Sequence, residues 1–269
     1  MINFTIYKTE LRLNLKMILI WSLIFSLMTI LTMSLFDTTR SQQATVNELL
    51  KTYPKEFIQA FKIDTDSFNT VEGFFSGRSL SLMIIANSVL AIFLGASAIG
   101  KEITSKTISF LITKPLNRLQ IYLSKSAVSI TLLFICNAIF ATVGFVSSRL
   151  LTSDKTGSIR YFAGLFFLLW LLQLIFLGVG QLLSTVMSDT QAIMTGVGLV
   201  FVSWIIDILG NISGVPDFVK YLTPLHYIDS AYLHTNHALQ VSDVVVLALT
   251  AIVIMLITAW RFNRRDIEV

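Results

Sequence analysis

Residues 161–186 read YFAGLFFLLWLLQLIFLGVGQLLSTV, and this stretch decides the fold. It contains no Asp, Glu, Lys, Arg or His. About 20 consecutive apolar residues are enough for a helix to cross the ~30 Å hydrocarbon core of a bilayer. The stretch therefore predicts a transmembrane helix.

Similar runs occur along the rest of the chain, and they lie at 17–36, 79–99, 126–148, 191–212 and 244–260. Hydrophobic residues make up 54% of the 269 residues, charged residues only 13%, and the mean hydropathy is +0.75. A soluble domain needs a more polar surface than this composition provides. The sequence predicts an all-α polytopic membrane protein, a single transmembrane domain over 1–269 with six transmembrane helices.

The distribution of Lys and Arg predicts the orientation, because basic residues near spans stay in the cytoplasm. With a cytoplasmic amino terminus, the cytoplasmic parts 1–16, 100–125 and 261–269 carry eleven of the 20 Lys and Arg. The remaining basic residues lie mostly in the long connection 37–78, where Asp and Glu balance them. We expect a multi-pass protein of the cell (plasma) membrane with both termini cytoplasmic.

The first 16 residues combine an apolar and a basic stripe at helical spacing. The apolar stripe is Phe4, Tyr7, Leu11 and Leu15, and the basic one is Lys8, Arg12 and Lys16. This pattern predicts an amphipathic helix in the cytoplasmic headgroup layer. A basic flank that only sets the topology is the alternative.

The connection after the second span is too long for a turn. Ile103, Thr107 and Phe110 fall on one helical face. Pro115 then biases the preceding residue away from helix, and Asn117 with Gln120 three residues later predicts the cap of the next helix. The sequence therefore predicts a short structured element before the third span.

The same connection resembles the cytoplasmic signature of ABC type-2 permeases. The matching residues are Glu102, Lys106, Thr107, Ile108, Leu111, Pro115, Arg118, Ile121 and Lys125. Lys106 departs from the pattern, since many relatives have Gly there. The ending Phe262, Arg264, Arg265, Asp266 and Ile267 is similar to the ending of that family, and residues 49–61 and 74–75 resemble the first external loop of one branch.

The resemblance implies a coupling helix within 101–113 that docks in a groove of a separate ATPase. It implies an exporter of two permease chains, identical or related, driven by two cytoplasmic ABC ATPase subunits that hold ATP and Mg. The residues expected to serve this ATPase coupling are Glu102, Lys106, Thr107, Phe110, Leu111, Pro115 and Arg118. An interfacial loop without a partner is the alternative.

Catalytic machinery is not recognisable in this chain, so we expect no enzyme and no cofactor of its own. The spans hold one acid, Asp207, and no His, which is too little for paired-acid, Ser–His or metal chemistry. Residues 95–101 match G-x-x-x-x-G-K, but Glu102 stands where Ser or Thr must bind magnesium. Basic residues in so apolar a chain flank spans, which argues against nucleic acid as a partner; membrane lipids are expected. A secondary transporter or channel remains the alternative, although no inverted repeat is evident.

Polar residues within the spans are candidates for the transport path or gate: Asp207, Asn87, Asn137 and Gln173. The amides are equally compatible with cross-links between helices. The Gly178/Gly180 and Gly196/Gly198 pairs predict close helix packing.

The external connection 213–243 contains all three histidines, His226, His234 and His237. Together with Asp229 they could hold a metal, but only two of them have close helical spacing. One or two short external helices that re-enter the interface are the favoured interpretation, so no metal site is predicted. The resemblance implies that such helices cap the path.

Overall fold

The computed structural model describes residues 3–42, 44–45, 48–49, 52–60, 69–104, 117–153, 155, 157–212 and 214–264, and for 78–79 and 101–104 it describes the backbone. The long helices are α1 (Phe4–Ser34), α6 (Ser81–Thr104), α8 (Arg118–Leu150), α9 (Ile159–Ser184), α10 (Asp189–Gly210) and α12 (Val241–Arg264). The short elements are α2 (Phe36–Ser41), α4 (Lys55–Ala60), α5 (Val71–Phe75), the π-helix η2 (Ser76–Leu80), the 3₁₀-helices η3 (Asp217–Leu222) and η4 (Pro224–Tyr227), and α11 (Ser230–Asn236).

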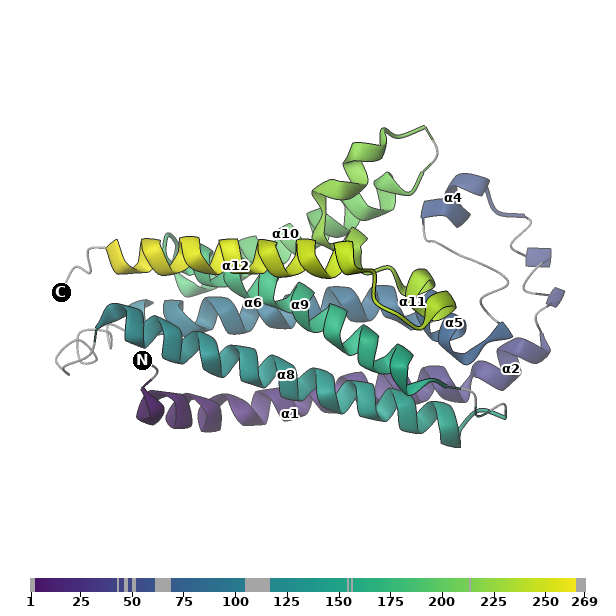
Figure 1. Cartoon of the computed structure of the whole chain (residues 1–269), viewed down its shortest axis with the longest axis horizontal. Coiled ribbons are helices and arrows are strands. Elements are labelled where there is room, and N and C mark those ends of the chain that lie inside the picture. Colours follow the sequence, from purple (N-terminus) through teal and green to yellow (C-terminus); the bar gives the residue numbers. More distant parts are fainter. Residues whose placement is uncertain are drawn as a thin grey trace.

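The six long helices form one bundle, and both termini lie at the same end of it (Figure 1). Helix α9 is central: it packs against α6, α8, α10 and α12, while α1 packs mainly on α8. Helices α2, α5 and α11 lie at the end opposite the termini, and η3 with η4 projects from the side of the bundle.

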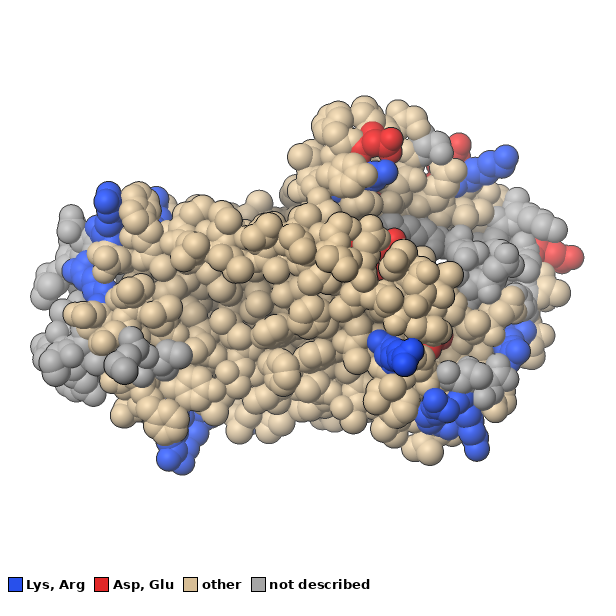
Figure 2. All heavy atoms as spheres, viewed as in Figure 1, with Lys and Arg blue, Asp and Glu red and all other residues tan. Residues whose placement is uncertain are grey.

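The surface of the bundle is apolar along its middle. Figure 2 shows Lys and Arg at the two ends and a band of other residues between them on the face in view. Within the described residues, six helices are long and apolar enough to cross a membrane. The predicted all-helical fold with six transmembrane helices is confirmed.

Glycines bring α6 and α9 into backbone contact. A Cβ added at Gly180 would lie 2.6 Å from the Ile92 carbonyl oxygen, and one added at Gly95 would clash with the Leu177 carbonyl oxygen. Because only glycine permits this approach, the two helices pack as one unit. The glycines at 95 and 100, which imitated a phosphate-binding loop in the sequence, therefore serve helix packing.

The predicted glycine contacts are confirmed at three positions and wrong at the fourth. An added Cβ at Gly178 would meet Ile254 of α12 at 2.8 Å, and one at Gly196 would meet Ile92 at 2.5 Å. Gly180 faces α6, as described above. A Cβ added at Gly198 would meet no atom of another element within 4 Å, because this residue is on the exposed face of α10.

The sequence predicted an interfacial helix over 1–16 and a transmembrane span over 17–36, but the structure has no break between these two parts. Helix α1 runs without interruption from Phe4 to Ser34. Its first turns are held along α8: Lys125 Nζ lies 2.8 Å from Glu10 Oε1, and the Tyr7 hydroxyl donates to Thr131 Oγ1 at 3.0 Å. These partners more than a hundred residues away keep the amino-terminal turns on the bundle.

Three short helices, not one or two, lie between α10 and α12: η3, η4 and α11. Leu225, Ile228 and Leu233 anchor this segment in the main core, and each is at most 5% exposed. Apolar side chains therefore attach the segment to the bundle, and its re-entry into the membrane interface stays a prediction.

Candidate functional site

The last turn of α6 and the first turn of α8 lie at the end of the bundle where α1 begins and α12 ends (Figure 1). Helix α6 ends at Thr104 and α8 begins at Arg118. Of the residues expected to couple to an ATPase, those outside the described residues are Lys106, Thr107, Phe110, Leu111 and Pro115. Glu102 lies in the last turn of α6, and Arg118 is half-buried in the first turn of α8.

The start of α8 has the predicted capping box. Gln120 Oε1 accepts the Asn117 backbone N–H at 3.2 Å, and the Asn117 side chain accepts from the N–H three residues on. A reciprocal cap of this kind fixes where the helix begins. The segment expected to contact the ATPase is therefore followed by a sharply defined helix start.

The carboxyl end of α6 touches the beginning of α10. A Cβ added at Gly100 would lie 3.1 Å from both Cα and Oδ1 of Asp189, the first residue of α10. Sequence reasoning missed this contact, although the Ser188–Gln191 capping box before α10 signals a fixed helix start. The end of α6 is therefore in direct contact with the start of α10.

A cavity of about 520 Å³ opens between α1, α6, α8 and α10 near this end. Its polar lining includes the ion pair of Lys125, the last residue of the signature, with Glu10. The Lys125 side chain is 5% exposed, and a buried charge of this kind is tolerated because its partner is close.

The three amides in the spans cross-link the centre of the bundle. Asn137 Nδ2 donates to Gln173 Oε1, and Gln173 Nε2 donates to Asn87 Oδ1 at 2.7 Å. All three residues are at most 1% exposed. Because they bond to one another across α6, α8 and α9, the cross-linking interpretation fits them better than a role on an open path.

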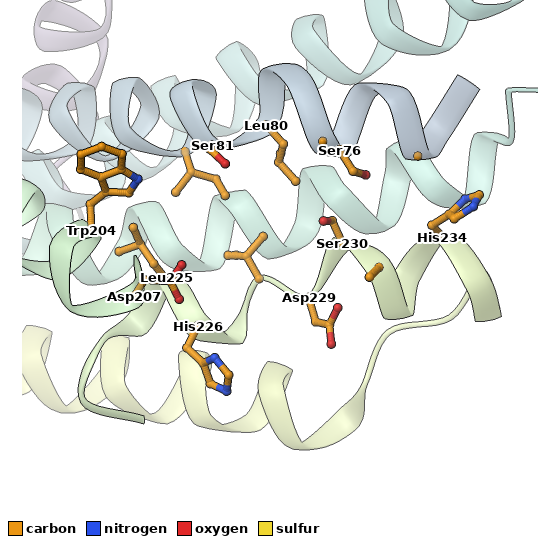
Figure 3. Close-up of a pocket in the computed structure, with 15 residues that line it drawn as sticks. Ser76, Leu80, Ser81, Trp204, Asp207, Leu225, His226, Asp229, Ser230 and His234 are labelled. Atoms are coloured by element: carbon orange, nitrogen blue, oxygen red, sulfur yellow. The ribbon is translucent and has the colours of Figure 1, made fainter. Parts of the chain in front are cut away.

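Asp207 lines a cavity of about 240 Å³ at the end opposite the termini (Figure 3). Ser76, Leu80 and Ser81 of η2 and α6 form one side of it, Trp204 and Asp207 of α10 close one end, and η4 with α11 forms the other side. Asp207 is half-buried there. Of the four candidates for a path or gate, it is the one that borders this cavity.

A buried carboxylate that sequence reasoning missed, Glu72, joins three external segments beside the cavity. It accepts from the Ser158 backbone N–H at 2.7 Å, and its other oxygen lies 3.1 Å from His234 Nδ1. The second nitrogen of His234 lies 3.1 Å from Thr70 Oγ1. Glu72 is 5% exposed, so these bonds fix α11 against α5 and the start of α9.

The histidines are not gathered as a metal site in the part of the chain that the structure describes. His237 Nδ1 lies 3.8 Å from the same Glu72 oxygen as His234, but no group of three His, Cys, Asp or Glu is placed to hold an ion there. Both His234 and His237 lie beside the same Glu72 carboxylate.

Comparison with known protein families gives a match over almost the whole chain. A family model described as ABC-2 family transporter protein covers residues 4–267. No curated protein gives a significant match. The match agrees with the six apolar helices. The chain therefore belongs to the ABC-2 transporter family and is a permease component of an ABC transporter.

Proposed function

We propose that the chain is the membrane-spanning permease subunit of an ATP-driven exporter. Two cytoplasmic ABC ATPase subunits would bind ATP and Mg, and two permease chains would enclose the path. The complex would lie in the plasma membrane with both permease termini in the cytoplasm. The observation that carries the proposal is the course of α6.

Helix α6 connects the two ends of the molecule. Its first residue, Ser81, lines the outer cavity, and its last turn leads into the segment expected to contact the ATPase. Between these points it touches α9 at Gly95. A rod with such contacts moves as one body, so displacement at the cytoplasmic end reaches the outer cavity.

Helix α10 forms a second link between the two ends of the molecule. It begins against Gly100 and ends near Asp207, on the outer cavity. Rocking of the coupling segment would therefore shift both α6 and α10 at the cavity. Opening of this cavity is the expected consequence of ATPase closure.

A second permease chain is supported by the weak burial of α10. Only Ala192, Gly196 and Val200 of this helix are buried. Its large exposed side chains are Met194, Leu199, Phe201, Val202, Ile205 and Leu209. Lipid or a second copy must cover this face, and a path needs more walls than one bundle provides.

The coupling proposal is tested by Phe110→Ala in the complex with the ATPase subunits, reconstituted in liposomes. We expect ATP turnover to become independent of the permease while the chain stays folded. The matched control is Phe4→Ala, which removes a 72% exposed phenylalanine near the same end of the bundle. Normal subunit binding and normal ATP-driven transport by the Phe110 variant would contradict the coupling role.

The orientation is tested with cysteine labelling. Cys136 is the only cysteine and is fully buried, so Cys136→Ala provides a cysteine-free chain. Cysteines placed at exposed Tyr53 and Arg264 report the two ends. A membrane-impermeant maleimide added to intact cells should label position 53 and leave position 264 unlabelled; the reverse pattern would refute the orientation.

A further inference from the structure

A groove of about 340 Å³ lies between α8 and α9 in the half of the bundle away from the termini. Its lining is apolar apart from one threonine: Phe134, Ala138, Ala141, Thr142, Phe145, Ile159, Phe162, Ala163 and Phe166. The alanines leave the space and the phenylalanine rings border it. Phe134 is 45% and Ile159 62% exposed, so the groove opens toward the surroundings of the bundle.

The groove runs along the helices. On α8 the lining residues Phe134, Ala138, Ala141 and Phe145 recur at spacings of four, three and four, which places them on one face. Arg149 continues this face one turn further. Its guanidinium carbon lies 5.5 Å from the centre of the ring of Phe145, the last lining residue on α8.

A second arginine stands at the same end, on the other wall. Arg160 follows the lining residue Ile159 in the first turn of α9, and it is exposed. Figure 2 shows Lys and Arg side chains at this end of α8 and α9. Arg149 thus continues the lining face of α8, and Arg160 lies next to the lining residue Ile159 in the exposed first turn of α9.

The connection between the helices contains one cation and one acid, Lys155 and Asp154, so the excess of positive charge at this end comes from the two arginines. Arg149 donates to the Lys155 carbonyl oxygen at 2.7 Å. Two carboxylates nearby already accept hydrogen bonds from this connection: Asp37 from Ser153, and Glu72 from Ser158. These bonds hold the connection in place without occupying the groove.

We propose that this groove binds an acyl chain of an anionic phospholipid, with the phosphate held by Arg149 and Arg160. The groove belongs to two transmembrane helices, so the hydrocarbon that reaches it is lipid. Flanking arginines alone are ordinary at a membrane interface. Here one arginine continues the lining face of α8 and the other lies next to Ile159 at the same end of the groove, so a chain bound in the groove would place its charged head near both.

The proposal predicts selectivity between lipids. A basic residue near an anionic membrane surface contributes about fivefold to attraction, so two arginines give roughly five- to thirtyfold. A zwitterionic lipid with the same chains fills the groove without this gain. The site does not depend on export, on the ATPase or on the orientation of the chain.

Tryptophan fluorescence provides a local readout. The Trp170 ring lies 5.7 Å from the Phe134 ring at the inner end of the groove, and the chain has four tryptophans. A chain with Trp21, Trp204 and Trp260 replaced by Phe reports lipid at Trp170 alone. It is placed in vesicles that contain phosphatidylglycerol or phosphatidylcholine with brominated acyl chains, which quench on contact.

We expect Trp170 to be quenched by brominated phosphatidylglycerol at about five- to thirtyfold lower mole fraction than by brominated phosphatidylcholine. Arg149→Gln with Arg160→Gln should abolish this preference, and Arg149→Lys with Arg160→Lys should retain most of it. Equal quenching by the two lipids, or a preference that survives the glutamine pair, would overturn the proposal.

The control is a chain that keeps only Trp260, which lies 4.7 Å from the Arg264 guanidinium at the opposite end of the bundle. The glutamine pair at 149 and 160 should leave its quenching unchanged. A change there would mean that the variants alter insertion of the whole chain. In that case Arg160→Gln alone, which removes no hydrogen bond described above, must still lower the preference at Trp170, or the proposal fails.

Discussion

The contact between α6 and α9 can be tested with one methyl group. In Gly180→Ala the new Cβ would lie 2.6 Å from the Ile92 carbonyl oxygen and 3.0 Å from the Ala96 nitrogen. Both neighbours are backbone atoms, so no side chain can move aside. An ordinary carbon–oxygen contact is about 3.3–3.6 Å, and the helices must therefore separate by roughly 0.7–1.0 Å.

This separation loosens packing along the two most buried spans. Overpacking of this kind costs about 1–3 kcal/mol of unfolding free energy. We expect Gly180→Ala to lower the unfolding midpoint of the purified protein in nanodiscs, followed by intrinsic fluorescence during heating. If α6 transmits the coupling motion, ATP turnover in the complex should fall as well.

The matched control is Gly198→Ala, the same substitution in a neighbouring span. Nothing lies within 4 Å of a Cβ at this position. Alanine has a higher helix propensity than glycine, so stability should be unchanged or slightly raised. Equal unfolding midpoints for the two variants would refute the claim that backbone contact at Gly180 stabilises the fold.

Three further substitutions test polar contacts. Glu72→Gln removes the carboxylate that fixes α11 and should cost about 1–3 kcal/mol locally, seen as faster hydrogen exchange in residues 230–236; exchange as slow as in the wild type would contradict this. Lys125→Met leaves Glu10, whose side chain is 23% exposed, without its cation and should cost about 1.5–3 kcal/mol in thermal unfolding, and adding Glu10→Gln should restore most of it. Gln173→Leu removes the side-chain hydrogen bonds of Gln173 to Asn137 and Asn87 and should cost roughly 1–2 kcal/mol in the same assay. An unchanged unfolding midpoint would show that these hydrogen bonds do not stabilise the contact between the helices.

The architecture was predictable because apolar runs of the right length have few alternatives in a chain this hydrophobic. Local signals were equally reliable: Asn117 and Gln120 are three residues apart, so the cap could be predicted from spacing alone. Small residues in spans were correctly assigned to packing where they face the bundle. The prediction for Gly198 was wrong because the sequence does not show which face of α10 is turned toward the bundle.

The contacts between distant segments could not be predicted. Glu72 counted in the sequence only as one acid of a charged loop, because its partners Ser158 and His234 lie 86 and 162 residues away. For the same reason the bond between Glu10 and Lys125 was not foreseen. A single sequence therefore predicts where the spans lie better than it predicts the polar contacts between residues far apart in the chain.

The π-helix η2 has a consequence for the outer end of α6. Backbone angles at Phe75, Ser76 and Ser81 are all helical, so residues 71–104 form one helical run of about 50 Å that carries Glu72 near its start and Glu102 near its end. A π turn contains one residue more than an α turn, so it acts as a phase shift of about 100° within this run. Deleting Gly77 would cancel the shift and rotate Glu72 away from Ser158 and His234 while leaving α6 in register with α9. The angular setting of the outer end is thus encoded by a single extra residue, separately from the packing of the span.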